Sequence, residues 1–222
     1  MAEEANRAKA ELELRALQMQ MNPHFVFNAL NSIQSYVMNQ DTLKANLYLS
    51  KFSRLIRLFL DSSRSKFISL AEEIKLLTLY IELEKIRFES KFEFEIIVDS
   101  MINKYVEIPT MILQPFIENA INHGLRYKHQ KGLLSIKFYK EVGYLICKIE
   151  DDGVGRNNAK KIQAKSSKGY KSQGLKITTE RLMTYNKIND ANIVFSIKDC
   201  IEKPDSPNDE VGTLIEIRFP EN

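Results

Sequence analysis

Cysteine is scarce in this sequence, and the features that mark membrane-spanning, secreted and nucleic-acid-binding proteins are missing. Only two cysteines, Cys147 and Cys200, occur in 222 residues, too few for a disulfide framework or a zinc site, so a reducing cytosol is the expected compartment. No apolar run is long enough to span a bilayer, and no signal peptide is visible. The net charge of only +3 does not indicate direct binding to nucleic acid or to a membrane surface. The composition is otherwise typical of a globular protein with one large or two small domains.

A histidine stands inside an otherwise helical pattern near the start of the chain. Strong helix formers run from Glu3 to about Met38 and are interrupted at Pro23, where a helix must kink or restart because proline lacks an N–H. Asn22 is a suitable N-cap, which predicts that His24 lies in a first turn. A neutral imidazole has a lone pair that can attack phosphorus. The alternative is a histidine with a purely structural role at a kink.

A second amphipathic helix is predicted after the polar turn at residues 39–42, with Asp41 or Thr42 as its N-cap. Its apolar positions are Leu49, Phe52, Ile56 and Phe59. Two amphipathic helices joined by a short turn form an antiparallel hairpin, which cannot bury both apolar stripes alone. We therefore expect a homodimer in which two hairpins form a four-helix bundle. The alternative is a hairpin that packs on its own downstream domain.

The polar stretch Asp61–Lys66 is expected to be a linker between a helical domain at residues 1–66 and a second domain at residues 67–222. The second domain opens with Ser69-x-x-Glu72, a capping box that starts a helix. Helical and strand patterns then alternate, which predicts an α+β domain. The expected strands are residues 91–99, 133–141, 144–151, 192–198 and 213–219, and the expected further helices are residues 110–124 and 175–188.

The predicted helix at residues 110–124 carries a polar stripe. On an α-helix, Asn119, Asn122 and His123 fall at i, i+3 and i+4 and share one face. Glu118 stands beside them, and Gly124 is expected to end the helix. Such a stripe can hold a hydrated Mg²⁺ through an oxygen while it contacts phosphates. The alternative is a solvated helix face.

Two glycine-containing stretches offer further binding chemistry. Asp151, at the end of a strand, can accept a hydrogen bond from an exocyclic amine such as that of adenine, and Gly153 and Gly155 let backbone approach a ligand. A simple turn is the alternative. Ser172-Gln173-Gly174-Leu175 opens a helix whose free N–H groups attract phosphate. The basic segment before it, residues 156–173, suits a mobile lid over a nucleotide, with a solvated loop as the alternative.

Four motifs in this order resemble the LytS/YehU-type sensor histidine kinases, from about Leu17 to Phe219. They are Pro23-His24-Phe25-x-Phe27-Asn28, Gln114-Pro115 through Asn119-Ala120 and His123-Gly124, Asp151-x-Gly153-x-Gly155, and Gly174-Leu175. The resemblance implies an N-terminal α-helical hairpin followed by an α+β two-layer sandwich of the Bergerat ATP-binding type. It implies that the first motif accepts the phosphoryl group and that the other three line the ATP site.

The same resemblance assigns roles to individual residues. It implies that His24 is phosphorylated, that Asn119 ligates Mg²⁺, that Asp151 binds adenine, and that Gly153, Gly155 and Gly174 shape the pocket and its lid. It also implies onward transfer to an aspartate of a response regulator, often one with a LytTR DNA-binding domain.

The chain departs from the family pattern at three places. Many relatives carry lysine where this chain has Asn122, so a charge that would reach the phosphates is missing. Ser172-x-Gly174 replaces a frequent Gly-x-Gly, although a serine hydroxyl can still donate a hydrogen bond. No acid directly follows His24; Asn28, one turn on, can orient the imidazole but is not a strong base.

The sequence therefore predicts ATP-dependent autophosphorylation of His24 in a two-component system. One alternative is a catalytically degenerate module that binds nucleotide and dimerises. Another is an ATP-gated clamp of the Hsp90 or gyrase kind, in which Glu118 would activate water. Because the helix begins directly after Met1, we expect a cytoplasmic fragment of a longer protein held in the bacterial membrane through an upstream sensor.

Overall fold

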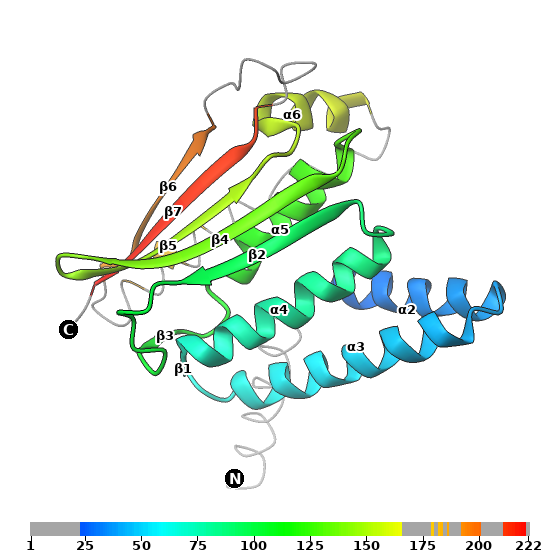
Figure 1. Ribbon diagram of the computed structural model, residues 1–222, viewed down its shortest axis with the longest axis horizontal. Coiled ribbons are helices and arrows are strands. Elements are labelled where there is room, and N and C mark those ends of the chain that lie inside the picture. The colour runs from blue at the N-terminus through cyan, green and yellow to red at the C-terminus, as the bar shows by residue number, and fades with distance from the viewer. Residues whose placement is uncertain are drawn as a thin grey trace, which may run out of the picture. The chain divides into compact units, whose positions relative to one another are not determined.

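The computed structural model describes residues 23–165, 179, 182–183, 186, 192–200 and 211–220. The chain divides into two compact units, Met1–Lys66 and Phe67–Asn222 (Figure 1). None of the helices within the described ranges combines the length and the apolar character that crossing a bilayer requires.

The first unit contains the helices α2 (Pro23–Met38) and α3 (Thr42–Ser62). Asp41 is the N-cap of α3, because its carboxylate accepts a hydrogen bond of 3.0 Å from the backbone N–H of Lys44. This confirms Asp41, one of the two predicted capping residues. The cap satisfies a backbone donor that the first turn of a helix otherwise leaves unpaired.

Two aromatic pairs join α2 to α3. The ring centroids of Phe25 and Phe52 lie 6.2 Å apart, and those of Tyr36 and Tyr48 lie 5.9 Å apart. The start of α2 therefore meets the middle of α3, and the end of α2 meets the first half of α3. The two helices run antiparallel.

The predicted linker at Asp61–Lys66 begins two residues too early. Helix α3 continues through Ser62, and the backbone N–H of Ser63 still donates to the carbonyl of Phe59 at 2.9 Å. Phe59 is buried and holds the last turn in place. The small polar residues that indicated a linker are thus partly helical.

The second unit is built on a five-stranded mixed sheet, in the order β2-β4-β5-β7-β6. Strand β2 pairs parallel with β4, and all other neighbours are antiparallel. The five predicted strands are confirmed to within two residues at each end. Their bounds are β2 (Phe92–Val98), β4 (Gly132–Glu141), β5 (Tyr144–Asp151), β6 (Val194–Asp199) and β7 (Thr213–Pro220).

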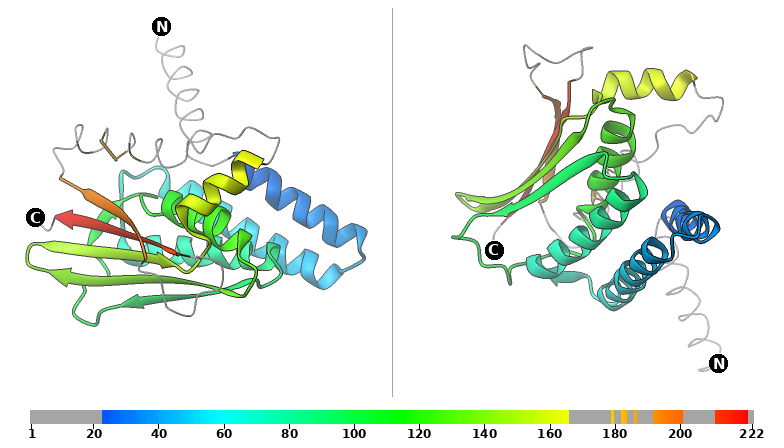
Figure 2. Two further views of the ribbon diagram at one scale, coloured as in Figure 1. Left: turned by 90° about the horizontal axis from the view of Figure 1, so that it is seen from above. Right: turned by 45° about the vertical axis from the view of Figure 1, so that its right-hand side comes forward.

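Helices α4 (Leu70–Arg87) and α5 (Gln114–Asn119) cover one face of this sheet (Figures 1 and 2). The capping box that starts α4 is confirmed. The Ser69 hydroxyl accepts from the N–H of Glu72 at 3.2 Å, and the Glu72 carboxylate accepts from the N–H of Ser69 at 2.9 Å. The core between the helices and the sheet contains fully buried Leu77, Ile81, Phe116, Ile136 and Phe138.

The second unit also contains a small two-stranded sheet that the sequence analysis did not predict. It pairs β1 (Phe67–Ser69) with β3 (Glu107–Pro109). Strands of three residues are too short for an alternating pattern to identify them. The first backbone N–H of α4, on Leu70, donates to the carbonyl of Val106 at 2.9 Å, so the segment before β3 also caps α4.

The predicted helix at residues 110–124 is wrong at both ends. Helix α5 begins only at Gln114, and the chain then passes into a π-helical turn, η1 (Ala120–Gly124), and a 3₁₀ turn, η2 (Leu125–Tyr127). Gly124 has φ −95° and does not end the helical path. Because the π turn follows Asn119, its spacing to residues 122 and 123 is not that of a regular α-helix.

A buried carboxylate explains why α5 starts late. Glu73 is 1% exposed and accepts hydrogen bonds from the N–H groups of Met111 at 3.2 Å and Leu113 at 3.3 Å. Met111 has φ +58°, a left-handed conformation that no helix continues through. Glu73 therefore fixes a turn where the sequence pattern predicts the first turn of a helix.

The basic segment at residues 156–173 does not begin as a loop. Helix α6 (Gly155–Lys165) occupies its first part, and Arg156 pairs with Asp199 of β6 through two hydrogen bonds of 2.7 and 2.9 Å. Few apolar residues mark this helix, which is why periodicity missed it. Ser172, Gly174 and Leu175 lie outside the described residues, as does most of the predicted helix at residues 175–188.

Candidate functional site

Asp151, the last residue of β5, is a buried carboxylate at a strand end. It is 3% exposed, and its Oδ1 accepts a hydrogen bond of 3.0 Å from the N–H of Gly153. Burial raises the pKa of Asp151 to about 7, while the hydrogen bonds from the Gly153 and Thr213 backbones act in the opposite direction. A carboxyl group has acceptor sites beyond these two, so it can still receive a donor from a ligand.

Two glycines pack directly on this carboxylate. A Cβ on Gly124 would lie 2.5 Å from Oδ1 of Asp151, and a Cβ on Gly153 would lie 2.4 Å from the carbonyl carbon of Gly124. Real Cβ atoms do not approach so closely, so neither position has room for a side chain. These contacts bring η1 against the end of β5 and define one end of the candidate site.

Gly155 and Gly212 allow a second close approach of backbone. Gly155 has φ +74°, and a Cβ there would lie 2.0 Å from the carbonyl oxygen of Val211. A Cβ on Gly212 would lie 1.9 Å from the carbonyl oxygen of Asp151. The sequence predicts glycines that admit a ligand, but in the described residues the approaching backbone is the protein's own. Gly212 was not among the predicted site residues, and Gly124 was predicted only as the end of a helix and as part of the second motif.

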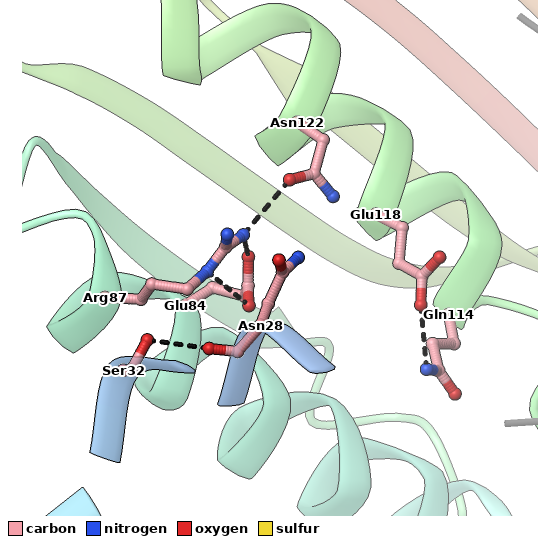
Figure 3. A network of polar contacts seen from close by, with 7 residues as sticks. All are labelled: Asn28, Ser32, Glu84, Arg87, Gln114, Glu118 and Asn122. Atoms are coloured by element: carbon pink, nitrogen blue, oxygen red, sulfur yellow. Dashed lines mark hydrogen bonds and ion pairs between the residues drawn. The ribbon is translucent and has the colours of Figure 1, made fainter. Parts of the chain in front are cut away.

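The polar face of α5 carries a buried amide. Nδ2 of Asn119 is buried and finds no hydrogen-bond partner among the described residues. An unsatisfied buried donor is costly, and in native proteins it usually indicates a missing partner. One turn earlier, Gln114 Nε2 donates to Glu118 Oε1 at 3.0 Å (Figure 3). An amide head and a carboxylate are groups that suit a phosphate and a hard cation.

Asn122 of η1 contacts the end of α4 (Figure 3). Nη2 of Arg87 donates to Oδ1 of Asn122 at 3.2 Å, and Nε of Arg87 donates to Oε1 of Glu84 at 3.0 Å. Glu84 is 1% exposed, and burial raises the pKa of its carboxyl group above the ordinary value, against the effect of Arg87. Glu84 and Arg87 were not predicted; their i, i+3 spacing of opposite charges was the available signal.

His123 lies in the same π turn and is half-buried. Burial lowers its pKa, and the positive charge of Arg126 lowers it further. The imidazole is therefore neutral at physiological pH, which allows one ring nitrogen to accept a hydrogen bond and the other to donate one.

His24 and Asn28 belong to the first unit. His24 is the second residue of α2, in agreement with the predicted first-turn position. Asn28 follows one turn later, and its backbone carbonyl accepts a hydrogen bond of 2.9 Å from the hydroxyl of Ser32 (Figure 3). In the second unit, the contact of η1 with β5 brings Gly124, which directly follows Asn122 and His123, against Asp151 and Gly153. Asn119 directly precedes this turn.

Comparisons with known proteins identify relatives of this chain. The profile of the family described as histidine kinase matches residues 12–92. Sensor protein LytS of Staphylococcus haemolyticus (strain JCSC1435) is 31% identical over 159 residues, which cover 72% of this chain and 27% of that protein. Sensor histidine kinase BtsS of Escherichia coli (strain K12) is 35% identical over 155 residues, which cover 68% of this chain and 27% of that protein.

The chain thus spans about a quarter of the length of the curated relatives it matches. Among solved structures, one described as "1.7 Angstrom Structure of a Bacterial Phosphotransferase" is similar to 94% of this chain and 96% of that chain, with a TM-score of 0.51 and 12% identity. At that identity the likeness concerns the fold alone.

Proposed function

Because this chain belongs to the histidine kinase family, and LytS-type sensor proteins are among its relatives, we propose that it is the kinase core of a two-component sensor. In this proposal the second unit binds ATP, His24 of the first unit becomes phosphorylated, and the phosphoryl group then passes to an aspartate of a response regulator. The LytTR class of regulator is the expected partner.

The observation that carries the proposal is the buried carboxylate at the end of β5. Asp151 is closed in by Gly124 and Gly153, and the buried amide of Asn119 lies on the adjoining helix. A buried acceptor at a strand end suits the exocyclic amine of adenine, and a polar helix face beside it suits the phosphates. We assign the second unit to the Bergerat type of ATP-binding sandwich on this basis.

The residues of α5 fit a magnesium ion bound together with the phosphates. Asn119 would hold Mg²⁺ through its amide oxygen. Its buried Nδ2, which has no hydrogen-bond partner among the described residues, would donate to a phosphate oxygen. When bound, the ion neutralises charge on the phosphates. His123, neutral because of its burial, would add a hydrogen bond to the nucleotide, and Asn122 would stand beside it.

The chemical step joins His24 to the γ-phosphorus of ATP. A ring nitrogen of the neutral imidazole forms the N–P bond, the bond from the γ-phosphorus to the bridging oxygen of ADP breaks, and the other ring nitrogen loses its proton. Asn28, one turn along α2, would orient the imidazole. Glu118 is the carboxylate of the site that we assign to accept the proton.

Exposed apolar side chains support a homodimer. Along α2 and α3, Phe27 is 65% exposed, Val37 is 62% exposed and Leu43 is 85% exposed. Contact with a second copy would remove this surface from water and complete a four-helix bundle. We propose that the full-length protein carries a membrane-bound sensor upstream, that the kinase core is cytoplasmic, and that it does not bind nucleic acid directly.

Incubation of the chain with Mg²⁺ and γ-labelled ATP tests the proposal. We expect acid-labile, base-stable label on the wild type and none on His24→Gln or Asn119→Ala. His129→Gln is the matched control, because His129 is exposed and belongs to no predicted motif. Label that persists in His24→Gln would contradict the proposal. ATP binding without any label would favour the degenerate nucleotide-binding module.

A further inference from the structure

The last turn of α4 presents an arginine whose orientation is fixed on three sides. Nε of Arg87 donates to Glu84 at 3.0 Å and Nη2 also pairs with that carboxylate, while Nη2 donates to Asn122 at 3.2 Å (Figure 3). The guanidinium lies 4.1 Å from the ring centroid of Phe88. A planar guanidinium that is bound by both oxygens of a carboxylate and stacked on an aromatic ring cannot rotate freely.

These contacts do not use all the donors of Arg87. A guanidinium has five N–H groups, and the hydrogen bonds within the described part of the chain involve Nε and Nη2. The two N–H groups on Nη1 are therefore left for another acceptor. The two N–H groups on Nη1 diverge, so each can donate one charge-assisted hydrogen bond to a phosphate oxygen, and an arginine whose other edge is already fixed is oriented to do so.

The position of Arg87 relative to the candidate site follows from η1. Gly124, at the end of this turn, packs on Asp151, where adenine would bind. The phosphate chain would extend from there toward Asn119, whose buried amide lies at the other end of the turn. Asn122 lies between these two residues in sequence, and Arg87 contacts it directly.

We propose that Arg87 binds the phosphate chain of a nucleoside triphosphate and supplies the positive charge that the neutral side chain of Asn122 lacks. The inference rests on the proposed ATP-binding function. Glu84 is then a positioning residue, because its buried carboxylate orients the guanidinium. The contrasting explanation is that Arg87 only neutralises Glu84 and has no contact with a ligand.

Calorimetry that measures the affinity of each variant for ATP and for adenosine distinguishes the two explanations. Replacing Arg87 alone would leave Glu84 buried without its partner and would destabilise the fold. The test variant is therefore the double replacement Glu84→Gln with Arg87→Gln. We expect its affinity for ATP to fall about tenfold or more and its affinity for adenosine, which has no phosphate, to stay within about twofold.

Lys85→Gln is the matched control. It removes one positive charge from the same turn of α4, but Lys85 pairs with Glu93 of β2 instead of contacting η1. We expect ATP affinity to change less than about threefold, since a partly exposed charge is screened. An equal loss in Lys85→Gln and in the double variant would show that the loss is not specific to Arg87 and would overturn the inference.

A rescue variant distinguishes phosphate binding by Arg87 from a purely structural role. Adding Asn122→Lys to the double variant should restore most of the lost ATP affinity, because it returns a positive charge to the same turn. ATP binding of the double variant at wild-type affinity, or an equal loss of ATP and adenosine, would overturn the inference. A wild type that binds neither ATP nor adenosine would contradict the proposed function itself, along with this inference.

Discussion

The two ends of the candidate site are built in different ways. At the Asp151 end, backbone packs on backbone and on a carboxylate, with Gly124 and Gly153 too close to their neighbours for any Cβ. At the Asn122 end, long side chains from α4 and η1 reach one another through hydrogen bonds near 3 Å. The first end is rigid because it leaves no space, whereas the second is held by polar contacts.

This difference indicates a division of labour in the proposed nucleotide site. A close-packed end suits a flat and invariant group such as a purine base. An end made of hydrogen-bonding side chains suits phosphates, whose number and charge change during the reaction. Substitutions at the two ends should therefore act differently. At the Asp151 end they should disrupt close packing, and at the Asn122 end they should weaken electrostatic contact with the phosphates.

The largest effect should follow from Gly153→Ala. The new Cβ would lie 2.4 Å from the backbone of Gly124, so η1 must move away from β5, and we expect a loss of about 3 kcal/mol in the free energy of unfolding together with loss of ATP binding. Thermal unfolding and calorimetry measure the two.

The control for this prediction is Gly143→Ala in the β4–β5 turn. Its Cβ would meet no atom within 4 Å, although φ there is +78°. We expect a cost of about 1 kcal/mol from the unfavourable φ alone, with unchanged ATP affinity. Wild-type ATP affinity in Gly153→Ala would show that close packing is not what shapes this end.

Asp151→Asn should change how the free energy of unfolding depends on pH, which tests the buried carboxyl group at the first end of the site. Because the folded protein holds the Asp151 proton up to a pKa of about 7, against an ordinary value of 3.8, the stability that this group contributes is fully present below about pH 4. It is lost as the pH rises to about 7. The variant cannot titrate, so the free energy of unfolding of the wild type should fall relative to that of Asp151→Asn across this window.

Urea unfolding at a series of pH values measures this difference. ATP affinity of Asp151→Asn should also fall about tenfold to a hundredfold, as expected when a buried acceptor for the base is altered. A pH-independent difference in stability between the two proteins would contradict the protonated, buried state of Asp151.

Glu73→Gln should have a moderate effect on α5, the helix that leads into η1. The amide retains one acceptor oxygen for the two N–H groups of Met111 and Leu113 that the carboxylate now binds. We expect a loss of about 1–2 kcal/mol in the free energy of unfolding, measured in urea. The neighbouring Glu72→Gln should cost less than about 0.5 kcal/mol, because glutamine also serves in a capping box. Equal costs would argue against the positioning of α5 by Glu73.

The smallest effect should come from Ser90→Gly, which lies at neither end of the site. Ser90 is exposed and has φ +58°, a conformation that glycine adopts without strain. The substitution should raise the free energy of unfolding by about 0.5 kcal/mol, because it relieves local strain. ATP affinity should not change, and a change would show that the α4–β2 turn is coupled to the site.

Local patterns in the sequence predicted the elements whose cause is local. The alternation of Phe92, Phe94, Ile96 and Val98 identified β2, and the Ser69–Glu72 spacing identified the start of α4. Asp151 was singled out because it stands at the end of a predicted strand, and the structure places it as the last residue of β5 with its carboxylate buried.

The features that were missed depend on contacts between distant residues. Glu73 and Met111 are 38 positions apart, and Arg87 and Asn122 are 35 positions apart. The first contact fixes the turn before α5, and the second places Arg87 beside η1. The π turn occurs where Gly124 packs on Asp151, which is also a contact between distant residues. No local spacing rule contains them, so the predicted helix at residues 110–124 was too regular.

Peptide mapping of the phosphorylated chain by mass spectrometry tests the central claim most directly. After incubation with Mg²⁺ and ATP, and with handling at alkaline pH to preserve phosphohistidine, we predict one phosphorylated residue, His24, in the wild type. At an ATP concentration near the wild-type Kd, the same residue should be phosphorylated to a much lower extent in Asp151→Asn. Phosphorylation at His123 or His129, or ATP hydrolysis with His24 unmodified, would contradict the account.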